Sequence, residues 1–243
     1  MPRTVLRFVV PLVVLWACRG EEPPPCGPSA ADPAGRGAPA EAAPAPAGGP
    51  EAGRPAVVFL GTSLTEGYGL SSPDSAFPAR VGRMLDSAGR SLPVVNAGVA
   101  GETSAGALRR IGRVLDRPLA VLVVELGAND GLRGQDPRAL EANLQAIVDS
   151  TKARHPDGPV LLAGMEAPPN LGPDYTARFR QVFRNVSTRN PGVHLIPFLL
   201  EEVAGREEMN QPDGIHPNAR GHRRIAEEVW AHLQPVLQRE GSR

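Results

Sequence analysis

The stretch "LAVLVVELG", residues 119–127, is the strongest strand candidate in the chain. Its apolar residues run continuously instead of alternating with polar ones, which is typical of a strand buried on both faces. Four further short segments share this apolar character, and patterns of helical period separate them. These segments are residues 56–61, 92–98, 159–165 and 193–198. The alternation predicts a parallel sheet with helices on both of its faces.

The segments between these strands carry apolar residues at helical spacing. Residues 136–156 give the clearest pattern, with Leu140, Leu144, Ile147, Val148 and Thr151 on one face. Residues 74–89 give another, in which Phe77, Val81, Met84, Leu85 and Ala88 are predicted to face inward. Three more helices are predicted over residues 104–116, 174–190 and 218–237. We therefore expect an α/β protein, a three-layer α/β/α sandwich around a five-stranded, mostly parallel sheet, in one domain over residues 55–243.

The N-terminal 54 residues differ in composition from the rest of the chain. Residues 1–17 carry two arginines near their start, Arg3 and Arg7, and continue as an apolar run too short to span a bilayer, which predicts a signal peptide. The ending "LWAC" resembles a bacterial lipobox, and this implies cleavage before Cys18 and a lipid on that cysteine. Residues 18–54 are rich in Pro, Ala and Gly and predict a disordered tether. Ordinary export, or a wrongly assigned start codon, would also explain such an N-terminus.

Charge and cysteine content exclude some classes of function. The chain has 26 Lys and Arg against 26 Asp and Glu, so it lacks the basic excess of nucleic-acid-binding proteins. Its two cysteines, Cys18 and Cys26, both precede the predicted domain. The domain itself therefore has no cysteine for a structural disulfide or a cysteine-ligated zinc site.

Several polar residues and glycines lie where they could form one site. Ser63, Gly98 and Asn129 each follow a predicted strand, and the carboxyl ends of parallel strands share one edge of a sheet. Asp213 and His216 lie three residues apart on a predicted turn. A carboxylate at that spacing can fix the histidine tautomer and leave the other ring nitrogen free as a base, which a serine nucleophile requires. Taken singly, each of these residues would also suit an ordinary turn or helix cap.

Four ordered blocks carry a family resemblance. They are "GTSLTEGYG" (61–69), "NAGVAGETSAGAL" (96–108), "ELGANDGL" (125–132) and "DGIHPN" (213–218). Together they resemble the blocks of the SGNH (GDSL-type) hydrolases, nearest to the exported bacterial acyl-CoA thioesterase, lysophospholipase and arylesterase group. The resemblance covers residues 55–237 and implies the flavodoxin-like fold of SGNH hydrolases.

The resemblance also implies a role for each site residue. Ser63 corresponds to the nucleophile, His216 to the general base and Asp213 to the carboxylate that orients it. The oxyanion hole would be formed by the backbone N–H groups of Ser63 and Gly101 and by the side-chain amide of Asn129. No metal or organic cofactor is implied.

One position departs from the family pattern. The first block of the family usually reads Gly-Asp-Ser-Leu, and Thr62 replaces the aspartate here. Because the serine is intact, we expect this change to alter the level of activity and not to abolish it.

The expected function is hydrolysis of carboxylic esters through an acyl-enzyme, with aryl esters, lysophospholipids and acyl thioesters as substrates. An exported enzyme would meet little acyl-CoA, which favours the carboxylic esters. The loop 165–179 follows a strand at the active edge and is expected to line the acyl pocket. We expect a monomer in the bacterial cell envelope, held to a membrane by Cys18 and facing the periplasm or the exterior.

Three alternatives stay open from the sequence. The first is a carbohydrate O-deacetylase of the same family. The second is a catalytically silent lipoprotein that binds lipids or glycans. The third is a flavodoxin-like nucleotide-binding protein, although the chain has none of the known Gly-rich phosphate loops.

Overall fold

The computed structural model of this protein describes residues 53–240. The predicted signal peptide, the predicted lipidation site at Cys18 and the predicted tether up to residue 52 lie outside the described residues. None of the helices within residues 53–240 combines the length and the apolar character needed to cross a bilayer.

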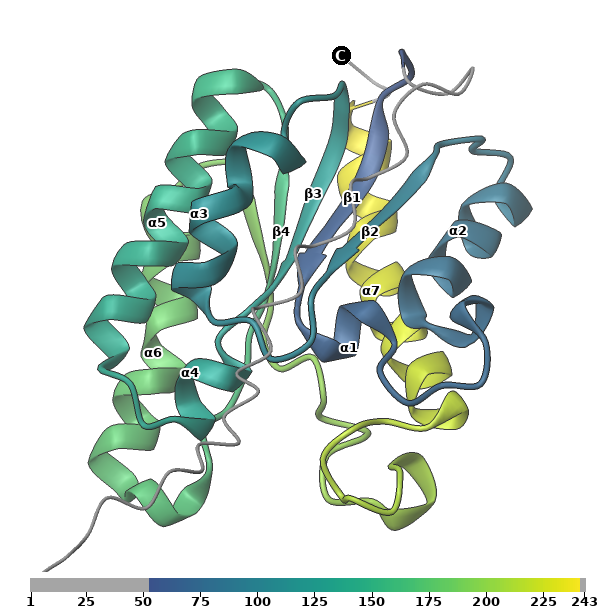
Figure 1. Cartoon of the computed structure of the whole chain (residues 1–243). Coiled ribbons are helices and arrows are strands. Elements are labelled where there is room, and N and C mark those ends of the chain that lie inside the picture. Colours follow the sequence, from purple (N-terminus) through teal and green to yellow (C-terminus); the bar gives the residue numbers. More distant parts are fainter. Residues whose placement is uncertain (1–52, 241–243) are drawn as a thin grey trace, which may run out of the picture. The chain divides into compact units, whose positions relative to one another are not determined.

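A five-stranded parallel sheet forms the centre of the domain (Figure 1). The strand order is β2-β1-β3-β4-β5, and each neighbouring pair is parallel. The strands are β1 (Ala56–Gly61), β2 (Val94–Gly98), β3 (Leu119–Glu125), β4 (Val160–Ala163) and β5 (Val193–Ile196). Each lies inside a segment predicted to be a strand. The predicted fold class is confirmed, and every strand pair in the described domain is parallel.

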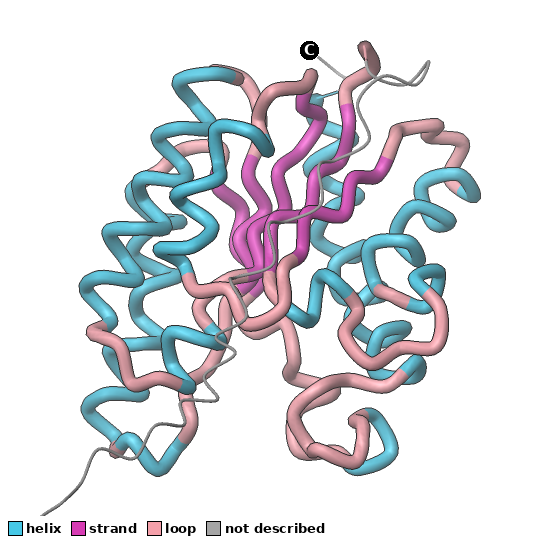
Figure 2. The backbone as a smooth tube through the Cα atoms, in the orientation of Figure 1, coloured by secondary structure: helices cyan, strands magenta, loops and turns pink. Residues whose placement is uncertain are grey.

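Helices cover both faces of this sheet, as Figures 1 and 2 show. One layer holds α2 (Phe77–Ser87) and α7 (Ala219–Glu240). The other holds α3 (Ser104–Val114), α5 (Pro137–Arg154) and α6 (Pro173–Arg189). These five are the predicted helices. The sequence did not predict the short elements, which are α1 (Ser63–Glu66), α4 (Ala128–Leu132), η1 (Pro73–Ser75), η2 (Pro169–Leu171) and η3 (Glu207–Met209).

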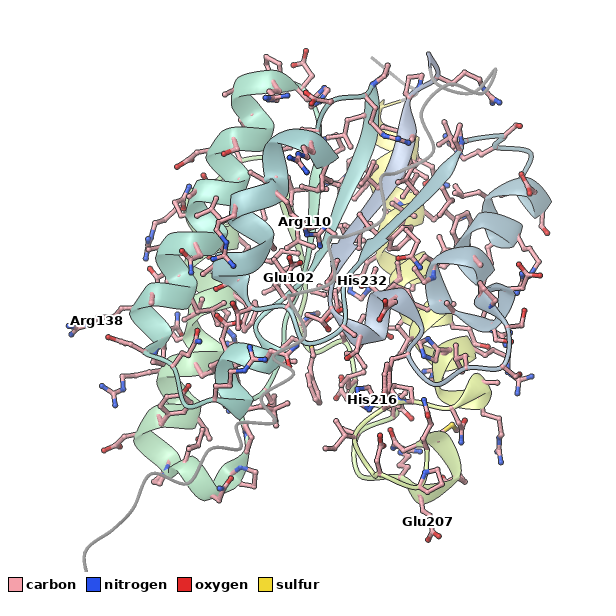
Figure 3. All side chains as sticks on the ribbon, in the orientation of Figure 1. Glu102, Arg110, Arg138, Glu207, His216 and His232 are labelled. Carbon is pink, nitrogen blue, oxygen red and sulfur yellow. The ribbon has the colours of Figure 1, made fainter. Side chains whose placement is uncertain are left out.

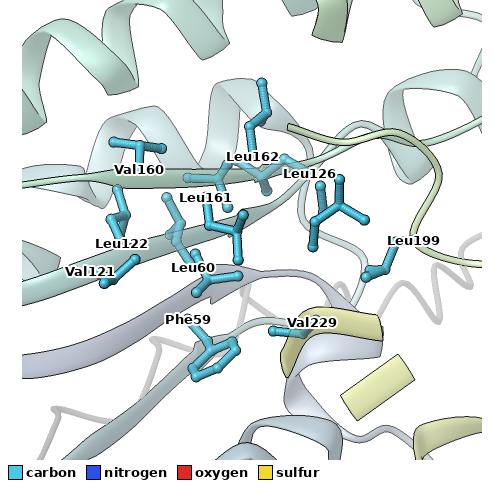
Figure 4. Packing of buried hydrophobic residues seen from close by; sticks show 14 of the residues in the cluster. Phe59, Leu60, Val121, Leu122, Leu126, Val160, Leu161, Leu162, Leu199 and Val229 are labelled. Carbon is cyan, nitrogen blue, oxygen red and sulfur yellow. The ribbon is translucent and has the colours of Figure 1, made fainter. Parts of the chain in front are cut away.

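The core lies between the sheet and its two helical layers (Figure 4). All six residues of β1 are buried, as are the last five of β3, which accounts for their continuous apolar sequence. The predicted inward face of α5 is fully buried. The prediction for Ala88 was wrong: this residue caps the end of α2 and is exposed, because the helix stops one residue before it.

The strand order and register determine which residues meet at the carboxyl edge of the sheet. Gly61 at the end of β1 pairs with Gly98 of β2 on one side and with Glu125 of β3 on the other. The chain reverses its direction of winding at this point, since β2 and β3 lie on opposite sides of β1. Ligands of open α/β sheets bind at such a switch point. One residue of the candidate site follows each of these strands: Ser63 follows β1, Gly101 follows β2 and Asn129 follows β3.

Candidate active site

Ser63 is the first residue of α1, a single turn that begins directly after β1. Thr62 before it is extended, and its carbonyl oxygen accepts a hydrogen bond from the N–H of Glu66 at 2.9 Å. Gly67 ends the turn with φ of 87°, a left-handed conformation that glycine adopts without strain. The buried strand thus delivers Ser63 into a tight turn at the edge of the sheet.

The turn rests against the end of β2. A Cβ atom at Gly98 would lie 2.2 Å from the backbone nitrogen of Glu66, so only glycine permits this approach. The side-chain amide of Asn96 donates to the carbonyl of Thr65 at 2.7 Å. Gly98, predicted only as a residue following a strand, therefore provides space for the turn that carries Ser63.

Ser63, His216 and Asp213 form a continuous hydrogen-bonded chain. The Oγ atom of Ser63 lies 3.1 Å from Nε2 of His216, although 153 residues separate them in the sequence. Nδ1 of His216 lies 2.7 Å from a carboxylate oxygen of Asp213. The structure thus brings the three predicted residues into hydrogen-bonding contact, and Figure 3 shows His216 beyond the ends of the strands.

Asp213 is held as an anion by its hydrogen bonds. Its other carboxylate oxygen accepts the backbone N–H groups of His216 at 3.0 Å and of Ile215 at 2.9 Å. The backbone and side-chain hydrogen bonds from His216, followed by that from Ile215, lower the pKa of Asp213 to about 2. A charged Asp213 accepts a hydrogen bond from the Nδ1–H group of His216 and leaves Nε2 to face Ser63 as a base.

Gln211 connects the turn that holds His216 to the turn that holds Ser63. Its side-chain amide donates to the carbonyl oxygens of Tyr68 at 2.8 Å and Pro217 at 3.0 Å. Its backbone N–H donates to the carbonyl of His216 at 2.7 Å. The ring of Tyr68 also lies against His216, with centroids 4.7 Å apart. Gln211 was not predicted to belong to the site, because nothing in the local sequence distinguishes it from any other polar loop residue.

Two of the three predicted oxyanion donors, Asn129 and Gly101, lie in segments that touch. The side-chain amide of Asn129, in α4, donates one N–H to the carbonyl of Glu102 at 3.0 Å, which leaves the second N–H available. Gly101, next to Glu102, has φ of 75°. Its carbonyl accepts a hydrogen bond from Arg133 at 2.9 Å. Glu102 is itself paired with Arg110, as Figure 3 shows.

The third predicted donor is the backbone N–H of Ser63. It has no partner within its helix, because Ser63 is the first residue of α1.

Comparison with known proteins identifies the family of this chain. A family model described as the GDSL-like Lipase/Acylhydrolase family matches residues 59–224, which is more than half of the chain. The chain belongs to this GDSL family. The recognition drawn from the four sequence blocks is confirmed, and the protein is a GDSL-type hydrolase.

Individual relatives cover nearly the whole described domain. Esterase TesA of Pseudomonas aeruginosa is 39% identical over 189 residues, which make up 77% of this chain and 92% of that protein. Thioesterase 1/protease 1/lysophospholipase L1 of Escherichia coli strain K12 is 36% identical over 188 residues, or 76% of this chain and 86% of that protein. A crystal structure of TesA, 37% identical, matches with a TM-score of 0.70 and covers 74% of this chain and 99% of its own.

Two buried carboxylates support the site of this GDSL hydrolase. Asp130, next to Asn129, is 1% exposed and accepts both the N–H and the hydroxyl of Ser104, at 2.9 and 2.5 Å. Asn143 of α5 donates in turn to the Ser104 hydroxyl at 2.9 Å. Asp130 therefore joins α4, which carries Asn129, to the start of α3, which follows the Gly101 loop.

Glu125 is the second buried carboxylate, at the end of β3. It is 1% exposed and lies below the turn that carries Ser63. Burial raises the pKa of Glu125 to about 7, and hydrogen bonds from Thr62 and Thr65 oppose this shift. The sequence analysis included Glu125 in a strand and a family block without assigning it a role. A lone charged residue at the end of an apolar strand was the available signal.

His222 is buried behind the site of this GDSL hydrolase and has a structural role. Its side chain lies in α7, where Nδ1 accepts the backbone N–H of Phe77 at 3.2 Å. Phe77 opens α2, and Ala76 before it offers no side-chain cap. His222 therefore caps α2 from a distant helix. Burial, with lesser contributions from Arg80 and His216, lowers the pKa of His222 to about 4.

Proposed function

We propose that this protein is a serine esterase that hydrolyses carboxylic esters through an acyl-enzyme on Ser63. The observation that carries this proposal is the continuous chain from Ser63 Oγ through the His216 ring to the Asp213 carboxylate. This arrangement provides a nucleophile, a base in reach of its proton and an anion that fixes the base.

The proposed reaction begins with proton transfer from Ser63 Oγ to Nε2 of His216. The serine oxygen attacks the acyl carbonyl, and the resulting oxyanion is bound by the N–H groups of Ser63, Gly101 and Asn129. His216 then protonates the leaving alcohol or thiol as the bond to the acyl carbon breaks. Water, deprotonated by the same nitrogen, releases the carboxylic acid and restores the serine. Asp213 stays ionised throughout, since its pKa of about 2 lies far below neutral pH.

An apolar rim around the site supports substrates with a hydrocarbon acyl chain. Within residues 53–240, the exposed large hydrophobic side chains are Tyr68, Leu132 and Ile215, each more than half exposed. Tyr68 follows the Ser63 turn, Leu132 ends the helix of Asn129, and Ile215 precedes His216. These positions suit contact with the acyl chain of an ester whose carbonyl is held at Ser63.

The predicted loop 165–179, which in the structure contains η2 and continues from Pro173 as the start of α6, supports the same assignment through its packing on α4. Ala167 and Phe179 lie close to Gly131, and the hydroxyl of Tyr175 donates to the carbonyl of Gln135 at 2.6 Å. The loop thus packs beside the helix that carries Asn129, a position from which it can contribute to the acyl pocket. The names arylesterase, carried by a relative from Vibrio mimicus, and thioesterase 1/lysophospholipase L1, carried by the relative from Escherichia coli, support aryl esters, lysophospholipids and acyl thioesters as substrates to test.

We further propose that the enzyme is exported and anchored at a membrane through Cys18. This part rests on the sequence of residues 1–18 alone. Replacement of Cys18 by alanine should move the esterase from the membrane fraction to the soluble fraction of the producing cell. Retention of the variant in the membrane fraction would contradict a lipid anchor at this residue.

The experiment for the proposed activity is hydrolysis of p-nitrophenyl esters from acetyl to palmitoyl by the protein and by its Ser63→Ala variant. Acetylated xylan, a lysophospholipid and an acyl thioester complete the panel. We expect serine-dependent turnover of esters with apolar acyl chains. Turnover limited to acetylated sugar would favour the O-deacetylase instead, and a folded protein inactive on every ester would favour a binding protein.

A further inference from the structure

Thr62, which precedes the Ser63 turn, and Thr65, which lies within it, both donate to one carboxylate oxygen. Oε2 of Glu125 accepts the backbone N–H of Thr62 at 2.9 Å and the hydroxyl of Thr62 at 3.1 Å. The same oxygen accepts the N–H of Thr65 at 3.3 Å and its hydroxyl at 2.8 Å. Oε1 lies 3.0 Å from the Thr62 hydroxyl. The chain on either side of Ser63 is thus hydrogen-bonded, through Thr62 and Thr65, to the same buried carboxylate.

The lack of a side chain at Gly61 leaves room for the carboxylate of Glu125. Glu125 is paired with Gly61 in the sheet, and a Cβ atom at Gly61 would lie 2.7 Å from Oε2 of Glu125. The same Cβ atom would lie 1.9 Å from the hydroxyl oxygen of Thr65. Glycine at position 61 therefore permits the contact between Glu125 and the turn that carries Ser63.

The contacts of Glu125 distinguish it from a carboxylate that holds the fold together generally. Every hydrogen bond that the described structure gives this side chain comes from Thr62 or Thr65, and none comes from a helix of the outer layers. Thr62 and Thr65 are themselves buried, at 1% and 0% exposure. Water is excluded from these groups, so each donor depends on Glu125 for its partner.

We infer that Glu125 is a positioning residue for the Ser63 nucleophile and acts through Thr62 and Thr65. This inference rests on the proposed function of Ser63. It also gives Thr62 a role, because a hydroxyl at this position donates to the carboxylate of Glu125. An aspartate at position 62 would instead place a second carboxylate beside the first, and the two could not both be ionised.

The test compares four variants with wild type. Glu125→Leu removes the acceptor, whereas Glu125→Gln keeps an oxygen that can accept the same donors. Thr65→Val removes one hydroxyl donor. Thr151→Val is the matched control, because the Thr151 hydroxyl is equally buried but bonds the carbonyl of Ile147 in α5.

Two reactions are measured on the full chain. The first is hydrolysis of p-nitrophenyl butyrate, which gives the rate kcat and the constant KM. The second is modification of Ser63 by phenylmethylsulfonyl fluoride, which gives a rate constant. In the latter reaction the serine oxygen forms a bond to sulfur, fluoride leaves, and the serine proton is taken up by His216. Intact mass reports the adduct. Circular dichroism and thermal melting report whether each variant is folded.

We expect Glu125→Leu to lower kcat and the sulfonylation rate about 100-fold with little change in KM, as a displacement of about 1 Å does. Glu125→Gln should stay within about fivefold of wild type, and Thr65→Val should lose about fivefold. Thr151→Val should leave both rates unchanged. If Glu125→Leu fails to fold, Thr65→Val against Thr151→Val decides the question.

Two failures can be told apart. Wild-type protein that neither reacts at Ser63 nor turns over the ester would overturn the proposed function itself. Wild-type protein that reacts, with folded Glu125→Leu and Thr65→Val variants as fast as Thr151→Val, would overturn the role of Glu125 alone.

Discussion

Replacing His222 by asparagine should change how the stability of this protein depends on pH. His222 is buried, and its Nδ1 caps α2 by accepting the N–H of Phe77. Protonation of Nδ1 would turn this acceptor into a donor and place a charge in the core. An asparagine can still accept the Phe77 N–H but has no proton to gain in this range. We therefore expect the variant to lose some packing, and with it some stability, at all pH values. It should also lack the further loss of stability that protonation of His222 causes in acid.

The magnitude follows from the two pKa values of His222. Its pKa falls from 6.5 in the unfolded chain to about 4 in the folded protein. A histidine with a lowered pKa contributes stability that is complete above pH 6.5 and is lost as the pH falls through 4. By linkage the loss is about 2 kcal/mol at pH 5 and about 3 kcal/mol at pH 4.

Glu125 has the opposite sign and must be separated from this effect. Its pKa rises from 4.5 to about 7, so its contribution is present below pH 4.5 and is lost as the pH rises through 7. Because Glu125 is present in both wild type and His222→Asn, its contribution cancels when the two proteins are compared at each pH.

The assay is urea unfolding of both proteins between pH 4.5 and 7.5. Wild type should be the more stable at pH 7, and its advantage should shrink by about 2 kcal/mol at pH 5. His232→Asn, in the same helix but with a side chain 33% exposed, is the matched control for replacing a histidine. An advantage that stays constant from pH 7.5 to 4.5 would refute the buried neutral state of His222.

Three further predictions concern ester hydrolysis, measured as kcat and KM with p-nitrophenyl butyrate. Asp213→Asn should lower kcat about 10³- to 10⁴-fold with little change in KM, because the amide favours the wrong tautomer of His216; a loss below tenfold would contradict the orienting role. Asn129→Ala should lower kcat about 10²- to 10³-fold by removing an oxyanion donor, and unchanged kcat would show that the amide does not face the oxyanion. Gln211→Ala should lower kcat about tenfold, because its amide joins the Tyr68 and Pro217 carbonyls; an effect confined to thermal stability would argue for a purely structural contact.

The sheet could be predicted because its three central strands, β1, β3 and β4, are largely buried on both faces. Such strands are apolar along most of their length, and β3 is apolar from Leu119 to Val124, which leaves a clear pattern in the sequence. Helix α5 was equally clear, since its inward face repeats over many turns. The helices α1 and α4 span four and five residues, too few for any periodicity to emerge. Both form where the chain leaves a strand, and tertiary contacts determine them.

The candidate site likewise has contacts that could be predicted from the sequence and contacts that could not. Asp213 and His216 are three residues apart, so their contact is local and could be proposed from spacing. The contact of Glu125 with Thr62 spans 63 residues and depends on the register of two strands, which no local pattern reveals. Gln211 likewise acts on Tyr68, 143 residues away. Residues that support the candidate catalytic groups thus became visible only in three dimensions.

Thr62 shows how a departure from a family pattern can be interpreted once its surroundings are known. From the sequence it was a missing aspartate, expected to alter the level of activity and not to abolish it. In the structure its hydroxyl contacts both carboxylate oxygens of Glu125, at 3.0 and 3.1 Å. The position therefore keeps a polar contact to the end of β3 while presenting no second negative charge.

The most direct test of the account is to trap the acyl-enzyme. The protein is mixed with excess p-nitrophenyl butyrate, quenched in acid within the first turnovers, and digested for peptide mass spectrometry, with Ser63→Ala treated in parallel. The account predicts a butyryl group on the peptide that contains Ser63 and none on the variant, which should also release no nitrophenolate above the uncatalysed rate. Ester turnover by Ser63→Ala, or a butyryl group on a different residue of the active wild-type protein, would contradict it.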